Sequence, residues 1–195
     1  MSSAAALGLP PRMSVAEFLV WDNGDPSGRL WQLVDGEPMA MAPASETHGR
    51  IQAELTVLIG LHLRRIGSPC AVVVTPGVVP RARATDNVRV PDLAVTCAPP
   101  AVGPSVRDPV LLVEILSPSN FAKTRLNVWS YISIPSVTEI LMVDSVTIGA
   151  ELLRRMDDKS WPEQPAVLGA DDALELRSIG FSVTLREIYR TTALV

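Results

Sequence analysis

Hydrophobic residues recur at helical spacing in some stretches of the chain and form short continuous runs in others. Over residues 46–66 they return every three or four positions, which predicts one long amphipathic helix. Residues 14–21 predict a short helix, because they open with the Ser-x-x-Glu spacing of a capping box. Asp35-Gly36 stands between two short apolar runs and predicts a β-hairpin.

Short runs rich in Val, Leu and Ile predict the strands of a β-sheet. A further helix is expected to run from the Ser-Pro-Ser-Asn of residues 117–120 to about Ile132. The side chains expected to face the sheet from this helix are Leu126, Trp129 and Ile132 or Ile134. The runs that predict strands cover residues 70–75, 78–81, 87–96, 110–116, 138–143 and 148–155.

The order of these elements predicts an α/β (α+β) fold, in which a mixed central β-sheet is flanked by helices and preceded by an N-terminal helix and a β-hairpin. At 195 residues, of which 47% are hydrophobic, the chain fits one globular domain. We expect residues 1–13 to be a flexible N-terminal extension and residues 14–195 to form that domain. No apolar run reaches the roughly 18 residues that a membrane-spanning helix needs, so no membrane partner is expected.

Charge and cysteine content limit the classes of function. The net charge of −4 and the pI near 5.2 argue against a general nucleic-acid coat protein, although they do not exclude a nuclease. Cys70 and Cys97 lack the spacing of a metal site, so we expect them to be reduced thiols in the core rather than a disulfide. Reduced thiols are typical of a cytoplasmic protein, and a cytoplasmic location is expected.

One carboxylate interrupts the apolar run over residues 110–116. This run predicts a strand buried on both faces, where Glu114 would be costly unless it were paired or bound to a metal ion. A role in metal binding is one interpretation. The alternative is that Glu114 ends the strand and is hydrogen-bonded by the Ser-Pro-Ser turn that follows.

A second carboxylate lies in the strand predicted over residues 87–96. Pro91 has no amide hydrogen, so the chain is expected to be irregular beside Asp92. If the two strands are neighbours, Asp92 and Glu114 can converge at one end of the sheet. Their oxygens, with the backbone carbonyl of Ile115 and waters, suit Mg²⁺ or Mn²⁺. The alternative for Asp92 is an ordinary carboxylate at a turn or strand end.

Five short motifs, in order, resemble a known family. Together they are similar to the Uma family of restriction-endonuclease-like bacterial proteins, which belongs to the PD-(D/E)xK nuclease superfamily. The resemblance covers roughly residues 14–155. The motifs are Leu-Val-Asp-Gly-Glu at residues 33–37, Met-Ala-Pro-Ala-Ser at 41–45 followed by His48 and Ile51, Val-Pro-Asp-Leu at 90–93, Val-Glu-Ile-Leu-Ser-Pro-Ser at 113–119 and Ile-Pro-Ser-Val-Thr-Glu-Ile at 134–140.

The resemblance implies a restriction-endonuclease-like core that holds a divalent-metal site and acts on DNA. Asp92 corresponds to the Asp of the family's Pro-Asp motif, and Glu114 to the acidic residue of the following strand. Glu37 matches the Glu of the Asp-Gly-Glu segment and is expected to be an additional acidic member of the site. The alternative for Glu37 is a charge at a hairpin turn. A homodimer is expected, because a nuclease that cuts both strands commonly pairs two copies.

A lysine commonly completes the site in this superfamily, and here the chain departs from the pattern. The position two after Glu114 is Leu116, and the family's relocated lysine corresponds to Asn127. Lys123 lies four residues before Asn127, would share its helix face and could supply the amine. The alternative is that Lys123 faces solvent near the start of the helix.

Two functions therefore follow from the sequence. The first is a metal-dependent endonuclease that hydrolyses phosphodiester bonds in DNA, with Asp92, Glu114, Lys123 and Glu37 as its site residues. The second is a catalytically impaired nuclease fold that serves as a nucleic-acid-binding or oligomeric interaction module. His62 is expected to be packed on its helix. His48 is expected to serve the helix start, although it could approach phosphate or water at the site.

Overall fold

The computed structural model describes residues 12–22, 26, 28–118 and 121–195, so residues 1–11 of the expected extension lie outside the described part. Its centre is a six-stranded sheet in the order β3-β4-β5-β6-β7-β8, in which β5 and β6 are parallel and the other neighbours antiparallel. The strands are β3 (Ala71–Val74), β4 (Leu93–Thr96), β5 (Pro109–Leu116), β6 (Glu139–Asp144), β7 (Gly149–Arg154) and β8 (Ala166–Gly169).

The strand β5 is central and is covered on both faces. Alternate side chains of a strand point to opposite faces, and in β5 Val113 and Ile115 pack in one hydrophobic cluster while Leu112 and Leu116 pack in another. All four are at most 5% exposed. The prediction of a strand buried on both faces is confirmed, and with it the mixed sheet flanked by helices.

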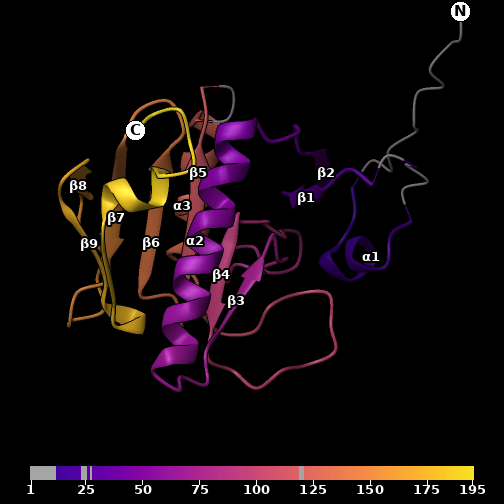
Figure 1. The fold of residues 1–195 in the computed structure, drawn as a ribbon. Coiled ribbons are helices and arrows are strands. Elements are labelled where there is room, and N and C mark those ends of the chain that lie inside the picture. The colour runs from indigo at the N-terminus through magenta and orange to yellow at the C-terminus, as the bar shows by residue number, and fades with distance from the viewer. Residues whose placement is uncertain (1–11, 23–25, 27, 119–120) are drawn as a thin grey trace, which may run out of the picture.

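The helix α2 (Glu46–Arg65) covers the first face and lies in front of the sheet in Figure 1. Its stripe of Ile51, Leu55 and Ile59 is fully buried in the cluster that contains Val113 and Ile115, as the helical spacing of these residues predicts. Ser45 begins the helix by accepting a hydrogen bond from the backbone N–H of His48.

The helix α3 (Phe121–Tyr131) connects the parallel strands β5 and β6 and packs on the second face. Its buried side chains include Val128 and Tyr131, whereas Leu126 and Trp129 are 66% and 68% exposed. The prediction that Leu126 and Trp129 face the sheet is therefore wrong. The side of the helix that is turned inward carries Val128 and Tyr131, which pack in the second cluster, and the polar groups that bond the Glu114 carboxylate.

The N-terminal elements lie beside the sheet, to the right of α2 in Figure 1. The short helix α1 (Val15–Leu19) has the predicted capping box. β1 (Trp31–Val34) and β2 (Glu37–Ala40) form the predicted hairpin, and Asp35 and Gly36 adopt the positive φ values, 50° and 82°, that such a two-residue turn requires. Backbone hydrogen bonds between Leu33 and Val88 join the hairpin to the chain that leads into β4.

The C-terminal segment contains elements that the hydrophobic pattern did not predict. β9 (Ala173–Leu176) and β10 (Phe181–Thr184) form a two-stranded sheet joined by the 3₁₀-helix η1 (Arg177–Ile179). A second 3₁₀-helix, η2 (Leu185–Tyr189), follows β10, and the Thr184 side chain makes no capping hydrogen bond to it. These elements complete the hydrophobic cluster under α2, where Leu185 and Tyr189 are fully buried.

Cys70 and Cys97 form a disulfide, so the prediction of two reduced thiols is wrong. Ala71 pairs with Thr96 at the end of the β3–β4 ladder, and one further step of this antiparallel register sets the two cysteines opposite each other. Their Cα atoms are 3.9 Å apart. The spacing of the two cysteines along the chain does not predict this pairing. The expectation of a cytoplasmic location loses the support that it drew from reduced thiols.

In the described part of the chain, no helix combines the length and the hydropathy needed to cross a membrane.

Candidate functional site

Asp92 and Glu114 meet at the end of the sheet where β4 begins and β5 ends. Leu93 pairs with Val113 in the antiparallel ladder, so the next step of the register sets Asp92 opposite Glu114. Both side chains line one cavity of about 610 Å³. Asp92 is 8% exposed and Glu114 is 5% exposed. The structure therefore brings together the two carboxylates expected from the sequence.

Asp92 is held by hydrogen bonds from two elements. Its Oδ2 accepts the backbone N–H of Ile115 at 2.6 Å, and its Oδ1 lies 2.9 Å from Nε2 of His48 on α2. The backbone carbonyl of Asp92 also accepts from the side-chain amide of Gln52 and the backbone N–H of Thr75. These bonds fix both the side chain and the irregular backbone that Pro91 predicts.

Residues of α3 bond the side chain of Glu114 from the face of the sheet opposite to α2. Its Oε1 accepts the hydroxyl of Tyr131 at 2.6 Å and the amide N–H of Asn127 at 3.2 Å. Burial and the negative charge of Asp92 raise the pKa of Glu114 to about 8, and the two hydrogen bonds only partly oppose that rise. Burial, and then the charge of Glu114, also raise the pKa of Tyr131 well above its ordinary value.

A buried cation lies near this pair. Arg89 is 7% exposed, and burial lowers its pKa against the opposing charges of Tyr131, Asp35 and Glu114. Among the described residues its Nε has no hydrogen-bond partner. Arg89 therefore offsets part of the negative potential at Glu114 but forms no ion pair with it in the described part of the chain.

The backbone of Ile115 adds an oxygen on the same side. The N–H and C=O of one strand residue point in the same direction, and the Ile115 N–H points to Asp92. The paired register of β4 ends at Leu93, one step before this position. The Ile115 carbonyl is therefore directed to the edge at which the two carboxylates meet.

A hard divalent cation fits this donor set. Two carboxylates and a carbonyl supply oxygen atoms, and Oδ1 of Asn127 is buried without a partner among the described residues. No three His, Cys, Asp or Glu side chains in the described ranges are grouped so that they could hold a metal ion. A cation here would complete its shell with water, as Mg²⁺ does when only one or two carboxylates bind it.

Two expected site residues are not brought to these carboxylates. Glu37 begins β2 with a side chain that is 64% exposed and lies 4.0 Å from Arg12, and it does not line the cavity. Lys123 lies in the first turn of α3, and its side chain falls outside the described part of the structure. Leu116, where many superfamily members carry lysine, is buried in the core.

Three groups that hold Asp92 or Glu114 in place were missed or assigned elsewhere by sequence reasoning. His48 was expected mainly to serve the start of its helix, with an approach to the site left open, and its ring contacts Asp92. Tyr131 was not considered, although its spacing of four from Asn127 places both on one face of α3. Gln52 gave no signal in the sequence. His62 is packed as expected, with Nε2 3.0 Å from the carbonyl of Ile179.

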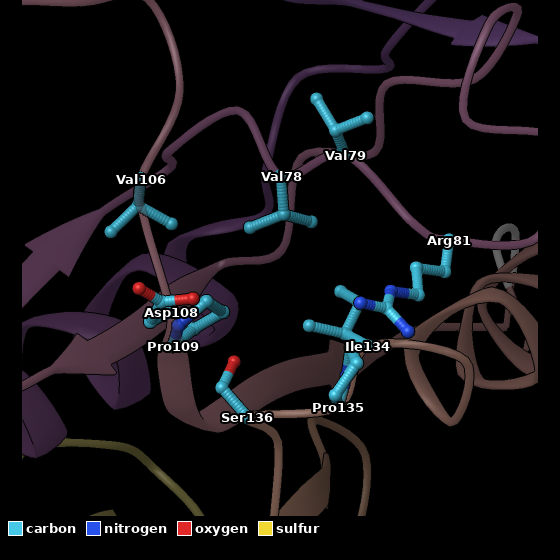
Figure 2. A pocket seen from close by; sticks show the side chains of 9 residues that line it. All are labelled: Val78, Val79, Arg81, Val106, Asp108, Pro109, Ile134, Pro135 and Ser136. Atoms are coloured by element: carbon cyan, nitrogen blue, oxygen red, sulfur yellow. The ribbon is translucent and has the colours of Figure 1, made fainter.

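A second cavity, of about 280 Å³, lies at the opposite end of β5, where Pro109 begins the strand (Figure 2). Figure 2 shows Arg81 beside Ile134 on one side and Asp108 beside Pro109 on the other. This cavity has a single carboxylate and none of the groups that surround Glu114. The paired carboxylates therefore make the larger cavity the candidate site.

Comparisons with known proteins agree with this fold. The chain is 31% identical over 188 residues to the "Uncharacterized protein slr1290" of Synechocystis sp., and the match covers 94% of both chains. A crystal structure of "a putative nuclease belonging to DUF820" from Anabaena variabilis superposes with a TM-score of 0.72 at 16% identity, over 91% of this chain and 98% of that one. This likeness confirms the nuclease-like fold.

The family comparison covers most of the chain. A model of the Uma2 family, described as "Putative restriction endonuclease", matches residues 15–186. The matched range contains both carboxylates and every residue that bonds them. The resemblance carried by the five motifs is thus confirmed, and the chain belongs to the Uma2 family.

Proposed function

We propose that this protein is a divalent-metal-dependent endonuclease that hydrolyses phosphodiester bonds in DNA. Asp92, Glu114 and the carbonyl of Ile115 are its ligands for Mg²⁺ or Mn²⁺. The observation that carries this proposal is the meeting of two buried carboxylates in one cavity, where burial and the charge of Asp92 raise the pKa of Glu114. Membership of a family described as restriction endonucleases supports the choice of DNA.

The residues around the carboxylates give the site a fixed geometry. His48 and the Ile115 N–H orient Asp92, while Tyr131 and Asn127 orient Glu114. When bound, the cation polarises the phosphodiester and makes a water molecule more acidic. Without the cation, burial and the charge of Asp92 favour the protonated form of Glu114 at neutral pH. Binding of the cation would favour the ionised form.

The binding of metal is the first test. We expect calorimetric titration with Mg²⁺ or Mn²⁺ to show binding by the wild type, and Asp92→Asn to weaken it by at least about tenfold, since loss of even an outer ligand contact has that effect. Asp108→Asn is the matched control, because Asp108 lies beside the smaller cavity at the other end of β5. A wild type that binds neither cation would refute the proposal.

Lys123 remains our proposal for the amine that orients the attacking water, since Asn127 cannot supply a positive charge. It predicts that Lys123→Ala abolishes metal-dependent cleavage of plasmid DNA, as Asp92→Asn does, without weakening metal binding. Cleavage that survives Lys123→Ala but not Asp92→Asn would remove Lys123 from the mechanism. Arg89 would then be the candidate for the positive charge at the site, because its charge acts on Glu114.

One observation bears on assembly: Leu126 and Trp129 form an exposed apolar pair on α3. A non-catalytic interaction module would use such a surface, and so would a homodimer of an active nuclease. We propose the homodimer. Sedimentation of the wild type beside Trp129→Ala measures it, and monomers at all concentrations would exclude it. Metal binding without any cleavage would favour the module.

A further inference from the structure

The outer side of α2 is apolar where a surface helix is ordinarily polar. In Figure 1 this side of the helix faces away from the sheet, and no described element covers it. Val57 and Leu61 are 50% and 59% exposed, and Ala53 is exposed beside them. A helix that packs one face on a core usually carries charged and polar residues on the other. The four-residue spacing of Ala53, Val57 and Leu61 instead sets three apolar side chains in one row.

Two glycines border this row, and the fold of the single chain does not account for them. Gly49 and Gly60 lie inside α2, where glycine is less favourable to the helix than alanine. Neither has the positive φ that would require glycine. A Cβ built on either residue would meet no atom within 4 Å, so no neighbouring segment of the described chain needs the space. Glycines at such positions allow another backbone to approach the helix closely.

The charges on this side of α2 lie at its two ends and are of opposite sign. Glu46 begins the helix and Arg64 lies in its last turn, and both are exposed. They are about five full turns apart, so both lie on the outer side. Arg50 also lies there, but its guanidinium is bonded to Glu46 and to the backbone carbonyl of Thr191. The apolar row therefore has an acid at one end and a base at the other.

We infer that the outer side of α2 binds the same surface of a second copy of this chain, with the two helices antiparallel. An antiparallel pair centred between Ala53 and Val57 sets Ala53 level with Val57 of the second copy. The same register sets Glu46 level with Arg64 of the second copy, and two-fold symmetry makes each of these contacts occur twice. A parallel pair would set Glu46 against Glu46. One register thus satisfies both the apolar row and the charges.

This contact is separate from the homodimer proposed at Leu126 and Trp129. α2 packs on the first face of the sheet and α3 on the second, so a copy that uses both surfaces binds two other copies. A wild type with both contacts therefore assembles beyond the dimer. The inference does not depend on metal binding or on cleavage, and the failure of either leaves it standing.

Sedimentation equilibrium of Trp129→Ala isolates the contact at α2, because this variant lacks the larger member of the α3 pair. One side of a helix is smaller than a standard protein interface, so we expect a weak dimer whose measured mass rises from one chain to two between about 1 and 100 μM. A Trp129→Ala protein that stays a monomer over this range overturns the inference. The α3 homodimer would then stand alone.

Gly60→Gln, made in the Trp129→Ala protein, fills the space beside the row. Glutamine is a better helix former than glycine, so the melting temperature should stay the same or rise. We expect dimerisation to weaken by at least about tenfold, because a side chain at this point holds the two backbones apart. Gly103→Gln is the matched control, since an added Cβ there also meets no atom within 4 Å. Dimerisation that survives Gly60→Gln overturns the inference.

Reversal of the charges tests the antiparallel register. Glu46→Arg alone and Arg64→Glu alone each set like charges level across the pair, and each should weaken the dimer by about three- to tenfold at low salt. The double variant restores opposite charges and should recover the lost affinity. Both changes oppose the helix dipole, so an effect within one chain would make the double variant worse than either single variant. A double variant that dimerises no better than the single variants overturns the inference.

Discussion

The two carboxylates of the site differ sharply in their surroundings. Asp92 accepts a backbone N–H from β5 and contacts a histidine ring of α2. Glu114 is buried deeper, shares one oxygen between two neutral donors and feels the charge of Asp92. In the absence of metal, Glu114 is the residue whose ionisation opposes folding.

This difference predicts how the stability of the metal-free protein depends on pH. The pKa of Glu114 is about 8 in the folded state against an ordinary value of 4.5, so the folded state holds a proton that the unfolded state has lost. The contribution of Glu114 to the free energy of unfolding is greatest below about pH 4.5, falls as the pH rises and is lost by about pH 8. Urea unfolding in EDTA between pH 5.5 and 8.5 measures it.

Glu114→Gln isolates the contribution of this one carboxyl group. The amide oxygen can still accept from Tyr131 and Asn127 but never ionises. We expect the variant to become more stable than the wild type as the pH rises, by on the order of a few kcal/mol at pH 8.5. A difference that stays constant over the whole range would contradict the raised pKa.

Sequence alone could predict both carboxylates but few of their partners. Glu114 stood out because a charge in an apolar run needs an explanation, and the motif around Asp92 gave the second ligand. Tyr131 lies 17 residues from Glu114, and His48 lies 44 residues from Asp92, so neither contact leaves a local pattern. Such partners are set by how elements pack, which periodicity does not reveal.

At the scale of elements, the start of α2 links stability to the site. Ser45 caps this helix at His48, and His48 contacts Asp92. We expect Ser45→Ala to lower the free energy of unfolding by about 1 kcal/mol and to weaken Mg²⁺ binding, because the first turn that carries His48 becomes less well ordered. Chemical unfolding and calorimetric titration measure the two effects.

Ser14→Ala is the control for this prediction. Ser14 caps α1 by the same kind of bond, and none of the residues of α1 lines the cavity. It should reduce stability to a similar or smaller extent and leave Mg²⁺ binding unchanged. Equal weakening of metal binding by both variants would show a general loss of stability rather than a link through His48.

For the helix α3, the sequence predicted the position but not which side faces the sheet. Its position between two strands followed from the pattern, but its orientation did not. Leu126 and Trp129 suggested the inward face, yet the helix turns Asn127 and Tyr131 inward, because Glu114 is buried and must be bonded there. The inward face of α3 thus combines Val128 and the Tyr131 ring, which pack in the core, with the polar groups that bond Glu114.

At the scale of the whole molecule, the disulfide joins the edge of the sheet to the strand that leads from Asp92. Cys70 and Cys97 are 27 residues apart, and closing a loop of that size contributes about 3–4 kcal/mol in the chain-entropy model. We expect the double variant Cys70→Ser and Cys97→Ser to lose stability of this order. Guanidinium unfolding without reductant provides the measurement.

A reductant distinguishes the effect of losing the disulfide bond from the effect of replacing the two cysteine side chains. Dithiothreitol should destabilise the wild type by a similar amount and have no effect on the double variant. A wild type whose unfolding does not respond to reductant would mean that the two cysteines are not joined in solution. The β3–β4 register brings the two cysteines together, and their spacing in the sequence could not have predicted the pairing.

The unequal burial of Asp92 and Glu114 also bears on the history of the chain. A lineage that no longer needed cleavage would keep Asp92, because the end of the sheet hydrogen-bonds to it. Glu114 could not be exchanged alone for an apolar residue, because the Tyr131 hydroxyl and the Asn127 amide would then be buried without their acceptor. An apolar replacement of Glu114 in such a lineage would therefore require changes at all three positions.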